Sequence, residues 1–324
     1  MYLMLPPPAG VLKLDQNEVP IQPPDYVVEA ASYMSRFVNW YPPRELYDEV
    51  KTLYAEYAGV KPEYVVLFPG VDGFFELFLR GVKKLVAPAP CFYKFEEYAR
   101  SLGVEILGAS IAGRFRLELS EFLDLAKRAD AIYIDSPNDP SGQLLISPRD
   151  LEEVLALGKP TVVDEAFFEF SGVSIVDLVE SWPNLAVVRT MSKAFLLAGF
   201  RITPVVFGRQ FKLHDGLWIS LPSLAAARAA LYKRDYVDDV VKTVKGEAQF
   251  LFGELQRLGF DVLPTYANFI LAKGPPGLAR GLRKFGVWVR DEEERLGPGY
   301  VRITVGTRGM NLQLVRTLAL LINS

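Results

Sequence analysis

The sequence predicts an α/β protein in which a large domain with a mostly parallel sheet, flanked by helices, is followed by a smaller α+β domain. Two observations predict this architecture. Between about residues 44 and 232, short apolar runs alternate with amphipathic stretches, which is typical of parallel strands joined by helices. The chain is also long enough for two domains, because it has 324 residues and half of them are hydrophobic.

The strands of the large domain are predicted from short runs that are β-branched or apolar at every position, as expected where both faces of a sheet are covered. Apolar residues at helical spacing predict the helices between them. The predicted strands are 65–68, 85–87, 131–134, 161–163, 185–188 and 205–207, and the predicted helices are 44–58, 70–80, 93–102, 120–128 and 148–157.

The pattern changes after about residue 221. One long helical stretch, 222–258, is followed by short runs with hairpin-like spacing, which indicate fewer strands and an α+β arrangement. These runs are 261–263 and 268–272, then a helix at 277–285, strands near 287–290 and 300–305, and a helix at 311–322. We therefore expect a proline-rich arm, 1–40, that packs on the small domain, a large domain, 41–232, and a small domain, 233–324.

Composition excludes several classes of function. A net charge of −3 gives no reason to expect nucleic acid as a partner, and no uncharged apolar run approaches the roughly 18 residues that a membrane span needs. The single cysteine, Cys91, excludes an internal disulfide, and the single histidine, His214, argues against a zinc centre. We expect a cytoplasmic protein whose chemistry depends on lysine, carboxylates, hydroxyls or a cofactor.

Lys193 is the strongest candidate for a catalytic residue. It follows Ser192 shortly after the apolar run 185–188, and Arg201 stands two helical turns further along. An amine at the end of a buried strand, with an arginine nearby, suits a lysine that holds an aldehyde cofactor carrying a phosphate. The alternative is a solvated lysine at the start of a helix.

Asp164 follows the predicted strand 161–163. An aspartate there suits a metal ligand, a helix cap or a counter-ion, and the lack of a second Asp, Glu or His cluster favours the counter-ion. A carboxylate against a pyridine nitrogen keeps that nitrogen protonated, so that the ring withdraws electrons. Pyridoxal phosphate chemistry requires this arrangement, together with a lysine that binds the aldehyde.

Two loops complete the predicted site. Gly70-Val71-Asp72 opens a helix, whose free backbone N–H groups and dipole suit a phosphate, although Asp72 also suits a helix cap. Asn138, in the rigid loop SPNDPSG (136–142), is its one side chain suited to a directed hydrogen bond. Because ligands of open α/β sheets bind beyond the carboxyl ends of the strands, we expect these groups to meet there.

These segments resemble the fold-type-I pyridoxal-phosphate enzymes and, among them, the histidinol-phosphate aminotransferases. The resemblance spans nearly the whole chain. The Lys193 segment is the most specific mark of the superfamily, and VRITVGTR, together with Arg290 before it, is the most specific mark of the subfamily. The motifs are LDQNEVP (14–20), WYPP (40–43), PGVDGFFELFLR (69–80), SPNDPSG (136–142), VVDEAFFEF (162–170), RTMSKAFLLAGFR (189–201) and VRITVGTR (301–308).

The resemblance implies how the cofactor, pyridoxal 5′-phosphate, is held. Lys193 would bind its aldehyde and move the substrate proton, Asp164 would pair with the ring nitrogen, and Asn138 would bond the ring's O3′. The ring would lie against Phe92 and Phe167. The groups implied for its phosphate are the Val71 and Asp72 amides, Ser192, Arg201, and Tyr41 from the other subunit of a homodimer.

The resemblance also implies the substrate site. Arg302 would grip the carboxylate of an amino acid and, with Arg290, the phosphate of histidinol phosphate, while Asn138 would lie beside the substrate. An arginine fork suits both groups because it donates two parallel hydrogen bonds.

Three positions depart from the family pattern. Phe92 stands where a ring-stacking tyrosine is usual, and Phe167 replaces a tyrosine that normally helps at O3′. The arm has LPPPAG (5–10) where the family has a tyrosine near the substrate phosphate. These departures concern the substrate more than the cofactor.

We expect a transaminase that moves an amino group between L-histidinol phosphate and 2-oxoglutarate in histidine biosynthesis. VRITVGTR favours this activity. Phe167 in DEAF favours a threonine-phosphate decarboxylase-like lyase, in which Cα–CO2 would break, and Phe92 leaves room for a transaminase with broader, aromatic specificity. A protein that binds pyridoxal phosphate without catalysis is the alternative from another class, and the presence of Lys193 argues against it.

Overall fold

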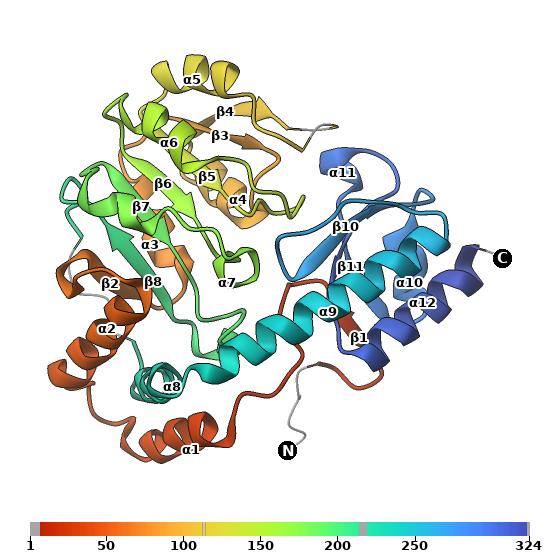
Figure 1. Ribbon diagram of the computed structural model, residues 1–324, viewed down its shortest axis with the longest axis horizontal. Coiled ribbons are helices and arrows are strands. Elements are labelled where there is room, and N and C mark those ends of the chain that lie inside the picture. Colours follow the sequence, from red (N-terminus) through yellow and green to blue (C-terminus); the bar gives the residue numbers. More distant parts are fainter. Residues whose placement is uncertain (1–6, 112, 114, 214–218, 323–324) are drawn as a thin grey trace.

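The computed structural model describes residues 7–111, 113, 115–213 and 219–322, and it contains two sheets, one in each half of the molecule (Figure 1). His214 lies outside the described residues. Among the described residues, no helix is long and apolar enough to cross a membrane, and no cluster of His, Cys, Asp and Glu side chains is arranged to hold a metal ion.

The larger sheet has seven strands. They are β2 (Val65–Phe68), β3 (Lys84–Ala89), β4 (Glu105–Ser110), β5 (Ala131–Asp135), β6 (Thr161–Asp164), β7 (Leu185–Val188) and β8 (Thr203–Phe207), in the order β2-β8-β7-β6-β5-β3-β4. β8 is antiparallel to both its neighbours, and the other neighbouring pairs are parallel. The predicted α/β class and mostly parallel sheet are confirmed.

Helices cover both faces of this sheet, so successive residues of its strands enter two different hydrophobic cores. In β6, Val162 packs in the core with residues of α3 (Val71–Leu79) and α4 (Tyr93–Ser101). Its neighbour Val163 packs in the other core, to which several helices contribute, among them four of the large half. These are α2 (Arg44–Ala58), α5 (Leu119–Lys127), α6 (Pro148–Leu155) and α8 (Leu221–Tyr232). This double burial explains why the strands are apolar at nearly every position.

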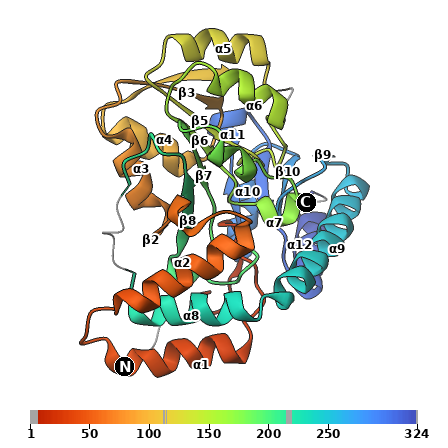
Figure 2. The ribbon, with the colours of Figure 1, turned by 60° about the vertical axis from the view of Figure 1, so that its left-hand side comes forward.

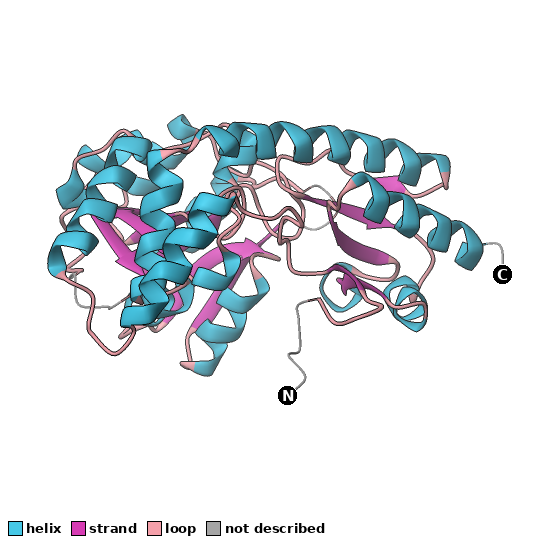
Figure 3. Ribbon diagram, turned by 90° about the horizontal axis from the view of Figure 1, so that it is seen from below, coloured by secondary structure: helices cyan, strands magenta, loops and turns pink. Residues whose placement is uncertain are grey.

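The smaller sheet has five strands, of which β1 comes from the N-terminal arm. They are β1 (Leu12–Leu14), β9 (Asp261–Val262), β10 (Phe269–Lys273), β11 (Val287–Asp291) and β12 (Tyr300–Thr304), in the order β1-β11-β12-β10-β9. β1 is parallel to β11, and the other pairs are antiparallel. The accompanying helices are α9 (Asp235–Arg257), α10 (Leu278–Lys284) and α12 (Arg308–Ile322), and the long helix α9 joins the two halves of the molecule (Figure 3).

The arm contacts both halves. Its strand β1 belongs to the small sheet, but α1 (Asp25–Met34) packs on α8 of the large half, so that α1, α8 and α2 lie side by side (Figure 2). The remaining elements are short. They are α7 (Phe168–Ser171) and α11 (Glu293–Leu296), with 3-10 turns at Ser35–Phe37, Pro62–Tyr64, Val176–Glu180 and Ala198–Phe200.

Two differences from the predicted elements have local causes. The predicted helical stretch 222–258 is two helices, because the chain turns at Lys233 and Arg234 between α8 and α9. The edge strand β4 was not predicted, since Glu105–Ser110 is only partly buried and includes glycine and serine, which give little strand signal. We propose the turn at Lys233 as the boundary between the large and small domains.

Candidate active site

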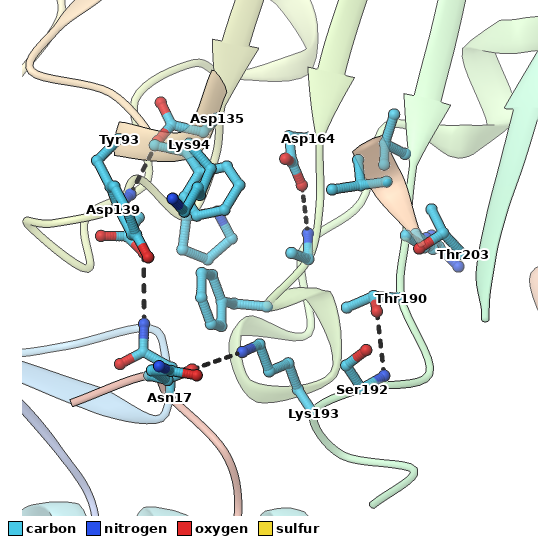
Figure 4. A pocket seen from close by; sticks show the side chains of 18 of the residues that line it. Asn17, Tyr93, Lys94, Asp135, Asp139, Asp164, Thr190, Ser192, Lys193 and Thr203 are labelled. Atoms are coloured by element: carbon cyan, nitrogen blue, oxygen red, sulfur yellow. Dashed lines mark hydrogen bonds between the residues drawn. The ribbon is translucent and has the colours of Figure 1, made fainter. Parts of the chain in front are cut away.

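The carboxyl ends of β5, β6 and β7 open onto a cavity of about 370 Å³. The order of the parallel strands reverses beside it, between β3 and β5, and this is where open α/β sheets bind their ligands. The start of α3, the N-terminal arm and β12 complete the wall, so both halves of the molecule contribute. Figure 4 shows side chains from the large half and the arm gathered around this space.

Asp164 ends β6 and is 5% exposed. The hydroxyl of Tyr133, on the neighbouring strand β5, donates to Asp164 Oδ2 at 3.0 Å, and the Ala166 N–H donates to Oδ1 at 3.0 Å. Burial raises the pKa of Asp164 to about 6, while these two hydrogen bonds act against the rise. At neutral pH the carboxylate is therefore charged and suited to pair with a buried cation.

Lys193 lies beyond β7, in the segment that returns to β8. Its Nζ donates to the backbone oxygen of Gln16 in the arm at 3.0 Å and lies 5.8 Å from the centre of the Phe167 ring. Burial, followed by the positive charge of Arg302, lowers the pKa of Lys193 to about 8. A sizeable fraction of this amine is consequently neutral near physiological pH, as a nucleophile or a general base must be.

The start of α3 forms a cradle for an anion. Gly70 precedes the helix at φ 87°, a conformation that favours glycine, and a Cβ at this position would lie 2.6 Å from Arg201 Nη2 where the guanidinium now lies. Arg201 donates to Asp72 Oδ2 at 3.3 Å. The amides of Val71 and Asp72 belong to the first turn of the helix, whose N–H groups have no partner within the helix.

These groups fit pyridoxal 5′-phosphate. An amine, a buried carboxylate, and a guanidinium beside a helix start all line one cavity, and they match the cofactor's aldehyde, ring nitrogen and phosphate. Ser192 and Thr203 also line the cavity and add hydroxyl groups to it. The fit is clearest at Gly70, where a missing side chain keeps the cradle open.

Two phenylalanines line the cavity at the positions where the sequence departs from the family pattern. Phe92 precedes α4 and packs at 6.5 Å from Phe75. Phe167 follows β6 and meets the ring of Phe269, from β10, edge-on at 5.1 Å. They provide apolar walls and no hydroxyl group.

The structure does not place Asn138 where the sequence predicted. This side chain is fully buried outside the cavity lining, and its amide donates to Pro90 O at 3.1 Å and to Asp135 Oδ1 at 3.0 Å. Its Oδ1 accepts from the hydroxyl of Ser141. The amide therefore holds the loop together, and the next residue, Asp139, faces the cavity instead.

Arg302 lines the cavity from the small sheet, on β12, and is 2% exposed. Its Nη1 donates to both carboxylate oxygens of Asp139, at 2.5 Å for Oδ2, and its Nη2 donates to Asp15 O at 2.8 Å. Arg290 faces Arg302 across β11 and β12. Arg290 is not part of the cavity lining. Its guanidinium stacks on the ring of Tyr93, 3.7 Å from the ring centre, and Tyr93 does line the cavity.

Tyr41 does not line the cavity of its own chain. It precedes α2 and is 86% exposed. A role for this residue at the cofactor therefore requires a second subunit.

Several lining residues were not predicted as site residues. Gln16 and Asn17 come from the arm, within the motif LDQNEVP, and Asp139 stands directly after Asn138 in SPNDPSG. Both motifs indicate that these loops lie at the site, but a sequence motif does not show which of its side chains face the cavity. The others include Tyr93, Lys94, Asp135, Thr190 and Thr203.

Comparison with known proteins gives the class. Residues 9–318 match the family described as aminotransferase class I and II. The protein belongs to this family, and it is a transaminase that depends on pyridoxal 5′-phosphate. The predicted cofactor and type of enzyme are thus confirmed.

Within this class, the chain is similar to the histidinol-phosphate aminotransferase of Sulfurisphaera tokodaii, with 31% identity over 92% of this chain and 86% of the relative. Two solved structures share its fold. The histidinol-phosphate aminotransferase of Sinorhizobium meliloti in complex with pyridoxal-5′-phosphate has a TM-score of 0.84 at 23% identity, and covers 96% of this chain and 90% of that one. The L-threonine-O-3-phosphate decarboxylase of Porphyromonas gingivalis has a TM-score of 0.79 at 18% identity, and covers 96% and 99%.

Proposed function

We propose that this transaminase transfers the amino group of L-histidinol phosphate to 2-oxoglutarate, giving imidazole acetol phosphate and L-glutamate. The observation that carries the proposal is the meeting of Lys193 and Asp164 with Arg302 in one cavity. The similarity to the Sulfurisphaera tokodaii enzyme supports the choice of substrate.

Each group near the cofactor has a proposed role. When bound, pyridoxal 5′-phosphate withdraws electrons from the substrate's α-carbon and carries the amino group between the two substrates. Asp164 is the counter-ion of the ring nitrogen, and Lys193 binds the aldehyde. Phe92 and Phe167 form walls against the ring, and the phosphate is held by the Val71 and Asp72 amides, Ser192 and Arg201.

Lys193 is also the proposed proton carrier. Its Nζ would be the group in the cavity that accepts the α-proton of the substrate. The pKa of about 8, which burial and Arg302 set, leaves part of the amine neutral for this task. The backbone oxygen of Gln16, 3.0 Å from Nζ, orients the amine within the cavity.

Arg302 and Arg290 are the proposed substrate anion sites. Arg302 lies at the cavity wall for the carboxylate of glutamate. Arg290 is its cross-strand partner on β11, and a guanidinium fork from each strand suits the phosphate of histidinol phosphate.

We propose a cytoplasmic homodimer with Tyr41 reaching the cofactor phosphate of the other subunit. The support is a run of exposed apolar side chains at the end of α1 and before α2. Contiguous exposed apolar surface is typical of interfaces, and a two-fold axis would place the same run on both subunits. Its members are Tyr33, Phe37, Val38, Trp40 and Tyr41.

A substrate panel tests the proposed function. The holoenzyme is mixed with L-histidinol phosphate, L-threonine O-3-phosphate, L-glutamate and aromatic amino acids, while the absorbance of the cofactor and the release of CO2 are followed. We expect conversion of the cofactor to its amine form by L-histidinol phosphate and L-glutamate, without CO2. Release of CO2 from the threonine phosphate would instead identify the lyase, and turnover of aromatic amino acids alone would identify the broader transaminase.

A further inference from the structure

The anion-binding arginine of this cavity already holds a carboxylate. Nη1 of Arg302 donates to both oxygens of Asp139, whose side chain also lines the cavity. Both residues are buried, with Arg302 at 2% and Asp139 at 3% exposure. A bidentate pair with so little solvent is a strong charge-assisted contact, and its two charges largely cancel.

Asp139 is fixed in this position by its surroundings. Its backbone N–H donates to Asp135 Oδ2 at 2.9 Å, and its Oδ2 accepts from Asn17 Nδ2 of the arm at 3.3 Å (Figure 4). The carboxylate therefore moves only by breaking its contacts with Asn17 and Arg302.

Arg302 keeps a limited capacity for another ligand. Nη2 donates to the backbone oxygen of Asp15, while Nε is buried and, within the described part of the chain, has no hydrogen-bond partner. A substrate carboxylate that approaches this fork meets the negative charge of Asp139 at close range. Two carboxylates at one buried site repel each other unless one is displaced or protonated.

We propose that Asp139 is a specificity-determining residue, an internal counter-anion that competes with the substrate's carboxylate for Arg302. The proposal rests on the proposed role of Arg302 as the anion site. Its consequence is selective: Asp139 weakens the binding of substrates that offer an anionic group to Arg302, such as a carboxylate, and leaves amines without an anionic group unaffected. Asp139 thereby reduces the difference in affinity between an amino acid and an amino alcohol as amino donors.

A matched control exists in the arm. Asp139 and Glu18 both raise the pKa of Lys193 through their negative charge. Glu18, however, pairs with Lys13 at 2.6 Å rather than with Arg302. Glu18→Gln therefore removes a charge that acts on Lys193 without freeing the arginine, and it separates a general electrostatic effect from competition at Arg302.

The test is calorimetric titration of the holoenzyme with glutarate, a dicarboxylate that has neither an amine nor a ketone. We expect Asp139→Asn, which keeps the size of the side chain, to tighten glutarate binding by about tenfold, the change expected when a close like charge is removed from a buried site. Glu18→Gln should leave the affinity within about twofold, as expected of a partly exposed charge. In turnover, Asp139→Asn should lower KM for L-glutamate and leave KM for L-histidinol unchanged.

The substitution Arg302→Gln completes a double-mutant cycle with Asp139→Asn. In this background, Asp139→Asn should give no tightening, because the contested partner is gone. Unchanged or weaker glutarate binding by Asp139→Asn, or equal tightening by Glu18→Gln, would overturn the proposal. If the Asn variant does not fold, a crystal structure of the wild-type enzyme with glutarate decides, since an intact Asp139–Arg302 pair would contradict competition. Glutarate binding needs no turnover, so failure of the proposed reaction is seen separately in the substrate panel.

Discussion

The two ends of the cavity are assembled differently. At the cofactor end, Asp164 and the segment of Lys193 follow β6 and β7, which are adjacent parallel strands in register. At the substrate end, Arg302 of β12 meets Asp139 of the loop after β5 and Asp15 of the arm. One end is thus local to a single sheet, whereas the other depends on three distant parts of the chain. Changes at the first should affect every substrate alike, and changes at the second should separate one substrate from another.

Lys193→Ala should have the largest effect. Without the amine there is no group at this position to accept the α-proton, so kcat should fall by about 10²–10⁴-fold or more for both amino donors. Steady-state and single-turnover rates with L-histidinol phosphate and L-glutamate measure it. Lys94→Ala is the matched control, because Lys94 also lines the cavity but is exposed. A Lys193→Ala enzyme with rates near wild type would contradict the proposed mechanism.

Asp164→Asn should have the next largest effect, and it gives a pH test. The carboxylate pairs with the ring nitrogen only when charged, and its pKa in the free protein is about 6. Affinity for pyridoxal 5′-phosphate should therefore fall as the pH drops through about 6. The Asn variant should bind the cofactor about 100-fold more weakly, as expected when one partner of a buried charge pair is removed.

The pH profile of cofactor binding by the Asn variant is the control. It should lack the step near pH 6 while keeping a rise through about pH 8, because in the proposed mechanism the neutral form of Lys193 would bind the aldehyde. If the step near pH 6 persists in the Asn variant, another group is responsible for it.

Arg295→Gln should have the smallest effect, and it should act on the substrate end alone. Arg295, on α11, donates to Cys91 O, to Glu96 Oε1 at 2.9 Å and to Glu292 Oε2 at 3.0 Å, and so ties the small sheet to α4. Glu292 is fully buried, and burial raises its pKa. We expect the free energy of unfolding to fall by about 1–3 kcal/mol. The KM for the amino donors should rise, with little change in the affinity for the cofactor.

Chemical denaturation and a cofactor titration check this prediction. Arg100→Gln is the control, since Arg100 pairs with the same Glu96 from an exposed position and such pairs contribute little. Equal losses in the two variants would mean that the link between α11 and α4 does not matter.

The cofactor end could be predicted from the sequence because each of its groups follows a strand or opens a helix. A buried strand is recognised by its apolar run, and the residue after it must lie at the edge where ligands bind. The structure has Lys193, Asp164 and the first residues of α3, Val71 and Asp72, lining one cavity.

The substrate end was less predictable for two reasons. The end of a strand gives the position of a loop but not which of two neighbouring side chains faces inward. The sequence pattern therefore indicates Asn138, whereas the side chain of Asp139 lines the cavity. The pairing of Asp139 with Arg302 joins residues 163 positions apart in the sequence, and no local pattern encodes it. The same holds for Gln16, whose backbone oxygen, rather than its side chain, contacts Lys193.

The strand contributed by the arm has a consequence for how the chain comes together during synthesis. Leu12 pairs with Val287, so the strand β1 is synthesised long before its partner β11. Bringing the two ends of so long a stretch together has an entropic cost, which the contacts of the small sheet offset only after β11 has formed. We infer that the five-stranded sheet is completed only after the strands of the seven-stranded sheet have been synthesised.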